Sequence, residues 1–130
     1  MGAYVAEQTI KAMNRKGVLV KDARILILGF TFKENCPDIR NTKVIDIIHT
    51  FQEYTQNITV FDPWADPERV LREYDARVTG NLPEGPFDAI VLAVAHKDFE
   101  TLDVRKLVRE GGVVYDVKGV LPRDLVDARL

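Results

Sequence analysis

Apolar runs and amphipathic stretches alternate along the chain, and their spacing predicts the secondary structure. Short apolar runs bounded by turn residues are typical of buried strands, whereas apolar residues three and four positions apart mark one face of a helix. The runs predict strands at residues 24–28, 57–61, 76–79, 88–95 and 113–117. The helical spacing predicts helices at residues 4–16, 42–54, 67–74 and 102–109. The fourth run is nearly all apolar, as expected for a strand covered on both faces of a parallel sheet.

Capping residues support the positions of these helices. Asn41 or Thr42 is suited to cap the second helix, because short polar side chains accept the first free backbone N–H groups. Asp66 followed by Pro67 predicts the N-cap and the first helical residue of the third helix. The Gly111-Gly112 pair is expected to end the fourth helix before the last strand begins.

The order of the elements indicates the fold. Strands that alternate with helices through short connections imply an α/β protein, with a three-layer, doubly wound, Rossmann-like sheet that is mainly parallel and follows an N-terminal helix. Ligands of such sheets bind in the crevice beyond the carboxyl ends of the strands. That rule selects five segments, at residues 30–40, 62–63, around 80, 96–97 and 118–119.

Composition narrows the class of protein. With 130 residues, of which 46% are hydrophobic, the chain is expected to form one compact unit with its own core. The net charge of −2 mixes both signs without a basic stripe, so nucleic acid is disfavoured as a partner. No apolar stretch approaches a membrane span. Cys36 is the single cysteine, which excludes an intrachain disulfide and a zinc site of paired cysteines and fits a cytoplasmic protein without a metal.

The segment between the first strand and the second helix carries the most informative chemistry. Lys33 is a flexible point charge suited to a pyrophosphate oxygen, and Arg40 offers a planar fork for a phosphate or carboxylate. Each cation also has a purely structural interpretation. Lys33 could be solvated only, and Arg40 could form a surface salt bridge with Asp38 or Asp46, which would be worth about 0–1 kcal/mol.

Polar residues after two other strands remain open to both kinds of interpretation. Asp62 could hold a ribose hydroxyl, as in a dinucleotide-binding fold, or it could end a strand and form a turn with Pro63. His96 stands where function is plausible, but a lone histidine also serves as a cap or an interface residue. Trp64 is expected to pack rather than to stack on a ligand.

Several motifs together resemble one known family. Gly29-Phe-Thr-Phe-Lys33, followed by Asp38-Ile-Arg40, resembles the signature of the C-terminal domain of the UDP-glucose/GDP-mannose dehydrogenase family. Three later motifs resemble that domain in order and spacing: Val60-Phe-Asp-Pro63, Ala93-Val-Ala-His-Lys97 and Tyr115-Asp-Val-Lys-Gly119. The resemblance covers residues 22–122. Residues 33–43 most resemble the branch that oxidises UDP-N-acetylated hexosamines for surface polysaccharides, although that family usually has Ser where Thr42 stands.

The resemblance implies an enzyme that oxidises the sugar C6 alcohol to a carboxylate in two NAD-dependent steps, through a covalent thiol intermediate. It also implies that NAD is bound mainly by an N-terminal domain, and that the nucleophilic cysteine belongs to a middle region. Neither part is among these residues. Cys36 is not that nucleophile, because the neighbouring acids Glu34 and Asp38 disfavour a thiolate. We therefore expect no catalytic residue in this chain and no activity from the chain alone.

The same resemblance assigns expected roles to single residues and segments. It places Phe32, Lys33 and Lys118 at the UDP-sugar and Arg40 toward the cofactor or the closing domain interface. We expect residues 1–21 to comprise a start added for expression, Met1-Gly2, and the tail of an inter-domain helix. Residues 22–130 are expected to form the UDP-sugar-binding domain. The remaining domains of the enzyme and, at full length, a second copy in a homodimer are the other implied partners.

Two rival classes of function have weaker support. A self-contained NAD-binding oxidoreductase domain would need a G-x-G-x-x-G turn, which the segment after residue 28 lacks. A stand-alone nucleotide-binding or signalling module of flavodoxin-like shape would suit Lys118 after the last strand. A signalling receiver of that shape also needs clustered acids after the first strand, and Phe30-Thr31-Phe32 supplies none.

Overall fold

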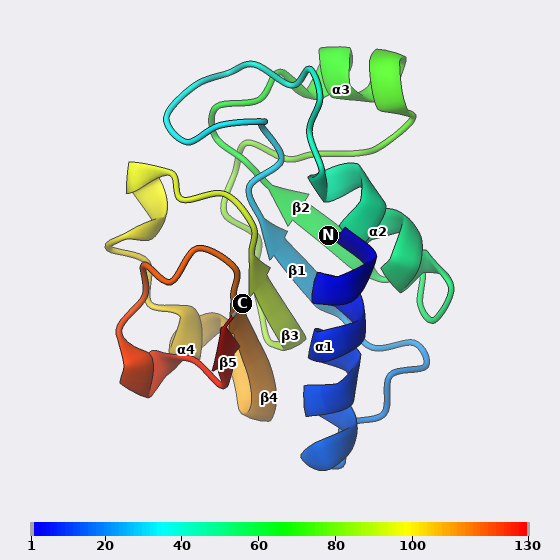
Figure 1. Cartoon of the computed structure of the whole chain (residues 1–130), viewed down its shortest axis with the longest axis vertical. Coiled ribbons are helices and arrows are strands. Elements are labelled where there is room, and N and C mark those ends of the chain that lie inside the picture. Colours follow the sequence, from blue (N-terminus) through cyan, green and yellow to red (C-terminus); the bar gives the residue numbers. More distant parts are fainter. Residues whose placement is uncertain (1, 130) are drawn as a thin grey trace.

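The fold is an α/β sandwich built on a five-stranded parallel sheet (Figure 1). The computed structural model describes residues 2–129, so Met1, part of the expected added start, lies outside the described residues. The strands run β2-β1-β3-β4-β5 across the sheet, and every neighbouring pair is parallel. Their bounds are Ile25–Leu28 (β1), Ile58–Phe61 (β2), Phe87–Leu92 (β3), Val108–Asp116 (β4) and Ala128–Arg129 (β5). The predicted fold class is confirmed.

Helices cover both faces of this sheet. The α-helices are α1 (Gly2–Arg15), α2 (Val44–Gln52), α3 (Pro67–Tyr74) and α4 (Val104–Leu107), and two 3-10 turns lie at Lys97–Phe99 and Arg123–Leu125. In Figure 1, α1 and α2 lie on one side of the sheet and α4 lies on the other. The short helix α3 lies beyond the carboxyl end of β2. The order of layers agrees with the predicted three-layer arrangement.

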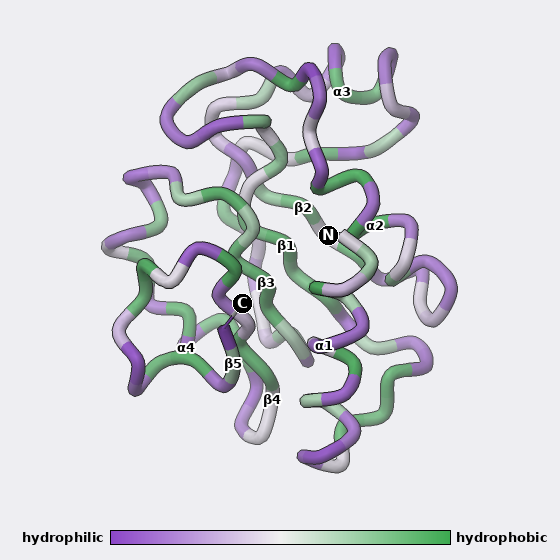
Figure 2. The backbone as a smooth tube through the Cα atoms, in the orientation of Figure 1, coloured by the Kyte–Doolittle hydropathy of each residue, from purple (hydrophilic) through white to green (hydrophobic). Residues whose placement is uncertain are grey.

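Strand β1 forms the centre of the core because neither of its faces is exposed. Ile25 and Ile27 pack in the apolar cluster that includes α1 and α2, whereas Leu26 and Leu28 pack in the cluster that includes Val104 of α4. All four β1 residues are fully buried. Burying an aliphatic side chain of this size is worth about 1.5–3 kcal/mol. Figure 2 shows these apolar strands inside a more polar outline of loops.

Helix α3 begins where the sequence predicts, whereas α2 does not. Asp66 caps α3 as predicted, since its side chain accepts an N–H from the first turn at 3.1 Å. Helix α2 begins later than predicted, at Val44, and Lys43 occupies its N-cap without a side-chain hydrogen bond. The predicted cap at Asn41 or Thr42 is therefore wrong in position. The Thr42 hydroxyl still accepts the Val44 N–H at 3.2 Å, from outside the helix.

Two predicted elements near the carboxyl half are wrong in extent. The helix expected over residues 102–109 is a single turn, α4, because Val108 already belongs to β4 and pairs with Phe87. The Gly111-Gly112 pair, expected to break the helix, lies inside β4 instead. Gly111 takes a left-handed φ of 82°, and the register between β3 and β4 shifts after Phe87. A local irregularity of the sheet therefore replaces the expected helix end.

The remaining strand predictions differ from the structure at their ends. The segment 76–79 forms only an isolated parallel bridge, between Thr79 and Phe61 at the end of β2. Strand β3 ends at Leu92, so the apolar residues up to Ala95 belong to the following loop. Both differences arise because apolar side chains are buried in loops as well as in strands.

Candidate functional site

The carboxyl ends of the parallel strands converge at one edge of the sheet. The loop over residues 29–43 leaves β1 there, Asp62 follows β2, His96 follows β3 and Lys118 follows β4. In Figure 1 this loop and α3 lie together beyond the ends of β1 and β2. Because open α/β sheets bind their ligands at this edge, these segments form the candidate site.

Gly29 is the point at which the chain leaves β1. Its φ is 98°, a conformation that L-residues rarely adopt. A Cβ on Gly29 would lie 2.6 Å from the Cβ and 2.9 Å from the backbone nitrogen of Val94. The close approach of two loops at the sheet edge therefore requires glycine here.

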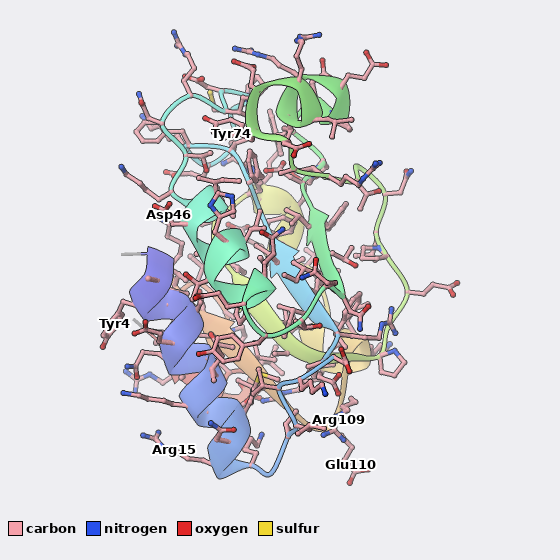
Figure 3. The ribbon with its side chains drawn as sticks, turned by 90° about the vertical axis from the view of Figure 1, so that its right-hand side faces the viewer. Tyr4, Arg15, Asp46, Tyr74, Arg109 and Glu110 are labelled. Carbon is pink, nitrogen blue, oxygen red and sulfur yellow. The ribbon has the colours of Figure 1, made fainter. Side chains whose placement is uncertain are left out.

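The loop over residues 29–43 folds back on itself and rests on α3. The Phe32 N–H donates to the carbonyl oxygen of Asp38 at 2.8 Å, which closes the loop. The hydroxyl of Tyr74 donates to the carbonyl of Ile39 at 2.5 Å, and its ring meets Phe30 edge to face with centroids 5.4 Å apart. Figure 3 labels Tyr74 where α3 adjoins the loop. The loop is thus an ordered part of the fold.

Asp62 ties the start of this loop to the end of β2. Its Oδ2 accepts the backbone N–H of Phe30 at 2.7 Å and of Thr31 at 3.0 Å, and its Oδ1 accepts the N–H of Trp64 at 2.7 Å. Burial raises the pKa of Asp62, but the hydrogen bond from His96 and those from the backbone outweigh it and leave the pKa below its ordinary value. The carboxylate is fully buried, so the interpretation of Asp62 as a ribose ligand is wrong.

His96 is the partner of Asp62 and is equally buried. Its Nδ1 accepts the backbone N–H of Asn35 at 2.9 Å, while its Nε2 lies 3.0 Å from Asp62 Oδ2 and 3.1 Å from the Thr31 hydroxyl. The ring of Trp64 stacks on the imidazole, with centroids 5.8 Å apart and planes at 21°. Trp64 therefore packs within the protein, as predicted. His96 has the role of an internal interface residue, which was one of its two open interpretations.

A pocket of about 240 Å³ lies between this loop, the starts of α1 and α2, and the loops after β3 and β4. Its lining includes Thr31, Phe32, Lys43, Val94, Val117 and Lys118. Phe32 is 54% exposed, which is unusual for an aromatic side chain that serves only the core. Lys43 and Lys118 are exposed, so one aromatic ring and two cations surround the pocket. Sequence reasoning missed Lys43, although its place at the start of a helix could have indicated it.

A second hollow, of about 640 Å³, lies on the α3 side of the same loop. Its lining includes Cys36, Asp38, Arg40, Trp64 and Arg69. Asp38 accepts from both Nε and Nη2 of Arg40 at 3.0 Å, so the salt bridge that was the structural alternative for Arg40 forms, with Asp38. The hydrogen bond from the Arg40 side chain lowers the pKa of Asp38 to about 2, although the Arg40 side chain is 72% exposed. The paired guanidinium of Arg40 thus lies at the rim of this hollow.

The comparison with known proteins settles the family. Residues 26–123 match the UDP-glucose/GDP-mannose dehydrogenase family, UDP binding domain. The chain belongs to this family. Two relatives are named UDP-N-acetyl-D-glucosamine 6-dehydrogenase: one from Salmonella typhi is 47% identical and one from Pseudomonas aeruginosa is 46% identical. Both alignments cover all of this chain, but the chain spans only 31% and 32% of those relatives.

A solved structure supports the same fold. An NDP-N-acetyl-D-galactosaminuronic acid dehydrogenase from Methanosarcina mazei Go1 superimposes with a TM-score of 0.83 at 23% sequence identity. The superposition covers 95% of this chain and 26% of that structure. This likeness shows that the two chains share a fold.

The predicted site residues lie at two separate places in the structure. Phe32 and Lys118 line the smaller pocket together, from loops that are 86 positions apart in sequence numbering. Lys33 is exposed next to Phe32. Arg40 lines the second hollow and not the pocket of Phe32. The structure thus separates the expected substrate residues from the expected cofactor residue.

The site offers no dinucleotide cradle of the Rossmann type. In that cradle, backbone N–H groups after the first strand point at a pyrophosphate. Here the N–H groups of Phe30 and Thr31 donate to Asp62 instead. The residues after β1 therefore do not fit NAD as its main site, which weakens the rival interpretation as a self-contained NAD-binding domain. The other rival, a receiver-like module, lacks the acidic cluster after β1, where Phe30, Thr31 and Phe32 stand.

Within residues 2–129, no three His, Cys, Asp or Glu side chains are grouped so that they could hold a metal ion. Among the same residues, no helix has both the length and the apolar character needed to cross a membrane.

Proposed function

We propose that this chain is the UDP-sugar-binding part of an NAD-dependent nucleotide-sugar 6-dehydrogenase that makes a uronic acid for surface polysaccharide synthesis in the cytoplasm. The proposed substrate is a UDP-N-acetylhexosamine, with UDP-glucose as the alternative. Identities of 47% and 46% to two relatives named UDP-N-acetyl-D-glucosamine 6-dehydrogenase support the first. The capsule-related name of a third relative, Protein CapL from Staphylococcus aureus, supports the role in polysaccharide synthesis.

The observation that carries the proposal is the pocket between Phe32, Lys43 and Lys118. Lysine ammonium groups are strongly attracted to phosphate oxygens, and the exposed ring of Phe32 offers an apolar surface for a base or a sugar. At about 240 Å³, the pocket is smaller than the roughly 300–1,000 Å³ of complete small-molecule sites. We infer that it is half of a site whose other walls come from further domains of the same enzyme.

In this proposal, the chain binds and orients the nucleotide-sugar and the chemistry takes place in the other domains. Lys33 and the two pocket lysines neutralise the pyrophosphate, and Phe32 packs against the ligand. Bound NAD would accept hydride from C6 of the sugar. Cys36 has no part in the reaction: it is half-buried in the second hollow, beside the Asp38–Arg40 pair and away from the Phe32 pocket.

The proposal also assigns a role to Arg40 and an oligomeric state to the full-length enzyme. We propose that Arg40 faces the cofactor or the closing domain interface, because Asp38 fixes its guanidinium at the rim of an open hollow. One guanidinium paired with a carboxylate is a contact and not a complete site, which agrees with NAD being bound mainly by another domain. We also propose that the full-length enzyme is a homodimer.

A titration of the chain with UDP-N-acetylglucosamine, followed by NMR of the backbone amides, tests the proposed site. We expect saturable shifts in residues 30–43 and 117–118. Lys33→Ala or Lys118→Ala should each raise Kd about tenfold, since losing one charge-assisted hydrogen bond costs about 1.4 kcal/mol. Lys21→Ala is the matched control, because Lys21 is exposed before the amino end of β1, at the opposite edge of the sheet.

Two outcomes would contradict the proposal. Saturable shifts that persist unchanged in Lys33→Ala and Lys118→Ala would place the ligand elsewhere. Saturable binding of NAD with shifts at residues 29–31 would favour the dinucleotide-binding rival instead. For the complete enzyme, NADH formation with UDP-N-acetylglucosamine is the decisive assay, and Lys33→Ala should raise KM there.

A further inference from the structure

Two buried polar side chains outside the Phe32 pocket form hydrogen bonds with the loop that carries Phe32. Asp62 and His96 are both fully buried and come from the ends of different strands, β2 and β3. Asp62 Oδ2 lies 3.0 Å from His96 Nε2. Neither side chain lines the pocket of Phe32 and Lys118. Their hydrogen bonds nevertheless converge on the loop that carries Phe32.

The hydrogen bonds of His96 define its protonation. Because Nδ1 accepts the Asn35 N–H at 2.9 Å, the ring hydrogen must be on Nε2 and the imidazole is neutral. The Nε2–H is then shared between Asp62 Oδ2 and the hydroxyl oxygen of Thr31. The Thr31 hydroxyl in turn donates to the carbonyl of Lys33 at 3.0 Å. A continuous chain of hydrogen bonds therefore runs from Asp62 to the residues beside the ligand surface.

This chain of hydrogen bonds anchors the loop on both sides of its exposed tip. On one side, Asp62 accepts the N–H groups of Phe30 and Thr31. On the other, His96 accepts the N–H of Asn35, and the Asn35 Oδ1 accepts the N–H of Lys97 at 2.8 Å. Asn35 has a left-handed φ of 55°, and both its N–H and its side chain contact the loop after β3. Phe32 and Lys33 lie between the two anchors.

We propose that Asp62 and His96 are positioning residues for UDP-sugar binding, and this inference rests on the proposed function of the pocket. Their hydrogen bonds hold the tip in its binding conformation before the ligand arrives. An ordered loop loses less conformational entropy on binding, so affinity is higher for the same contacts. The effect should appear as a change in affinity and in loop order while the sheet itself stays intact.

Variants of His96 separate positioning from packing. His96→Phe keeps a ring beneath Trp64 but removes all three side-chain polar contacts, those with Asn35, Asp62 and Thr31. Asp62 keeps its backbone N–H donors. His96→Asn places an amide oxygen near the position of Nδ1, so it can still accept the Asn35 N–H. His49→Gln is the control, since His49 is an exposed histidine on α2. Thr31→Val removes the hydroxyl that links His96 to Lys33 in nearly the same shape, and it serves if His96→Phe does not fold.

The experiment measures two quantities in each variant. The first is hydrogen exchange of the loop amides without ligand, and the second is Kd for UDP-N-acetylglucosamine from NMR titration. In His96→Phe we expect faster exchange at Asn35 and about tenfold weaker binding, with the amides of β1 and β3 unchanged. His96→Asn should restore Asn35 protection and bring Kd to within about threefold of the wild type. His49→Gln should match the wild type in both.

The outcomes distinguish this inference from the proposed function. If the wild type binds and His96→Phe or Thr31→Val binds within about twofold of it, the positioning role is refuted. If the Asn35 amide exchanges equally fast in the wild type and in His96→Phe, the anchoring itself is refuted. If the wild type does not bind but its Asn35 amide is protected by His96, the anchoring stands, and the proposed binding of the UDP-sugar by this chain alone is refuted.

Discussion

Replacing Gly29 with alanine tests how closely the ligand loop is packed against the sheet edge. Gly29 has a φ of 98°, and a Cβ there would lie 2.6 Å from Val94 Cβ and 2.9 Å from Val94 N. A backbone atom cannot rotate out of the way as the end of a side chain can. Alanine therefore has to move the loop after β1 or the loop after β3.

The size of the effect follows from two separable costs. Forcing an L-residue into the left-handed region costs about 1–2 kcal/mol, and overpacking a dense site typically costs about 1–3 kcal/mol more. We expect Gly29→Ala to lower the free energy of unfolding by about 2–5 kcal/mol. Gly111→Ala is the matched control, because Gly111 has a φ of 82° but a Cβ added to it would meet no atom within 4 Å. This variant should lose about 1–2 kcal/mol, from the conformational cost alone.

Urea unfolding followed by circular dichroism measures both variants under the same conditions. The m-value should stay constant, so that the midpoint reports stability directly. Equal losses in Gly29→Ala and Gly111→Ala would show that the contact with Val94 carries no strain, and would refute the reasoning. A Gly29→Ala chain that fails to fold while Gly111→Ala folds normally would exceed the expected difference in the same direction.

Three further predictions concern stability, each measured by urea unfolding. Asp127→Ala should lower the free energy of unfolding by about 1–3 kcal/mol, because it leaves the Val114 N–H without its acceptor. Arg69→Ala, which removes the surface pair of Arg69 with Glu73, should lower it by less than about 0.5 kcal/mol. Asp66→Ala should cost about 1 kcal/mol through loss of the α3 cap, and equal stability would contradict the capping role. Burial raises the pKa values of Asp62 and Asp127, but their hydrogen bonds lower both below the ordinary value. The unfolded chain then binds more protons, so stability should be complete above about pH 4 and should fall as the pH drops further; a flat profile down to pH of about 3 would contradict this.

Local signals in the sequence predicted the elements whose ends are set locally. The bounds of α3 were predicted correctly, because Asp66 and Pro67 specify its start within a few residues. The bounds of α4 were not, because they depend on the pairing of Val108 with Phe87 across the sheet. Strand pairing over such a separation has no signature in a local hydrophobic pattern.

The same difference between local signals and contacts of distant residues applies to the candidate site. Phe32, Lys33 and Arg40 could be singled out because they stand together between a strand and a helix. The contact of Asp62 with His96 joins residues 34 positions apart, so the sequence left both roles open. Lys43 was missed because the pocket it lines is formed by five separate segments, which only the fold brings together.

The anchored loop has a consequence for how this domain can change its ligand. The exposed side chains at the loop tip, Phe32 and Lys33, are distinct from those that hold the loop, which are Thr31 and Asn35 together with the buried Asp62–His96 pair. Selection or mutagenesis can therefore change the residues of the exposed tip while the hydrogen bonds that hold the loop stay unchanged. A library for new nucleotide-sugars would randomise positions 32–34 and keep positions 31 and 35 fixed. A change of ligand specificity would then require no change in the fold.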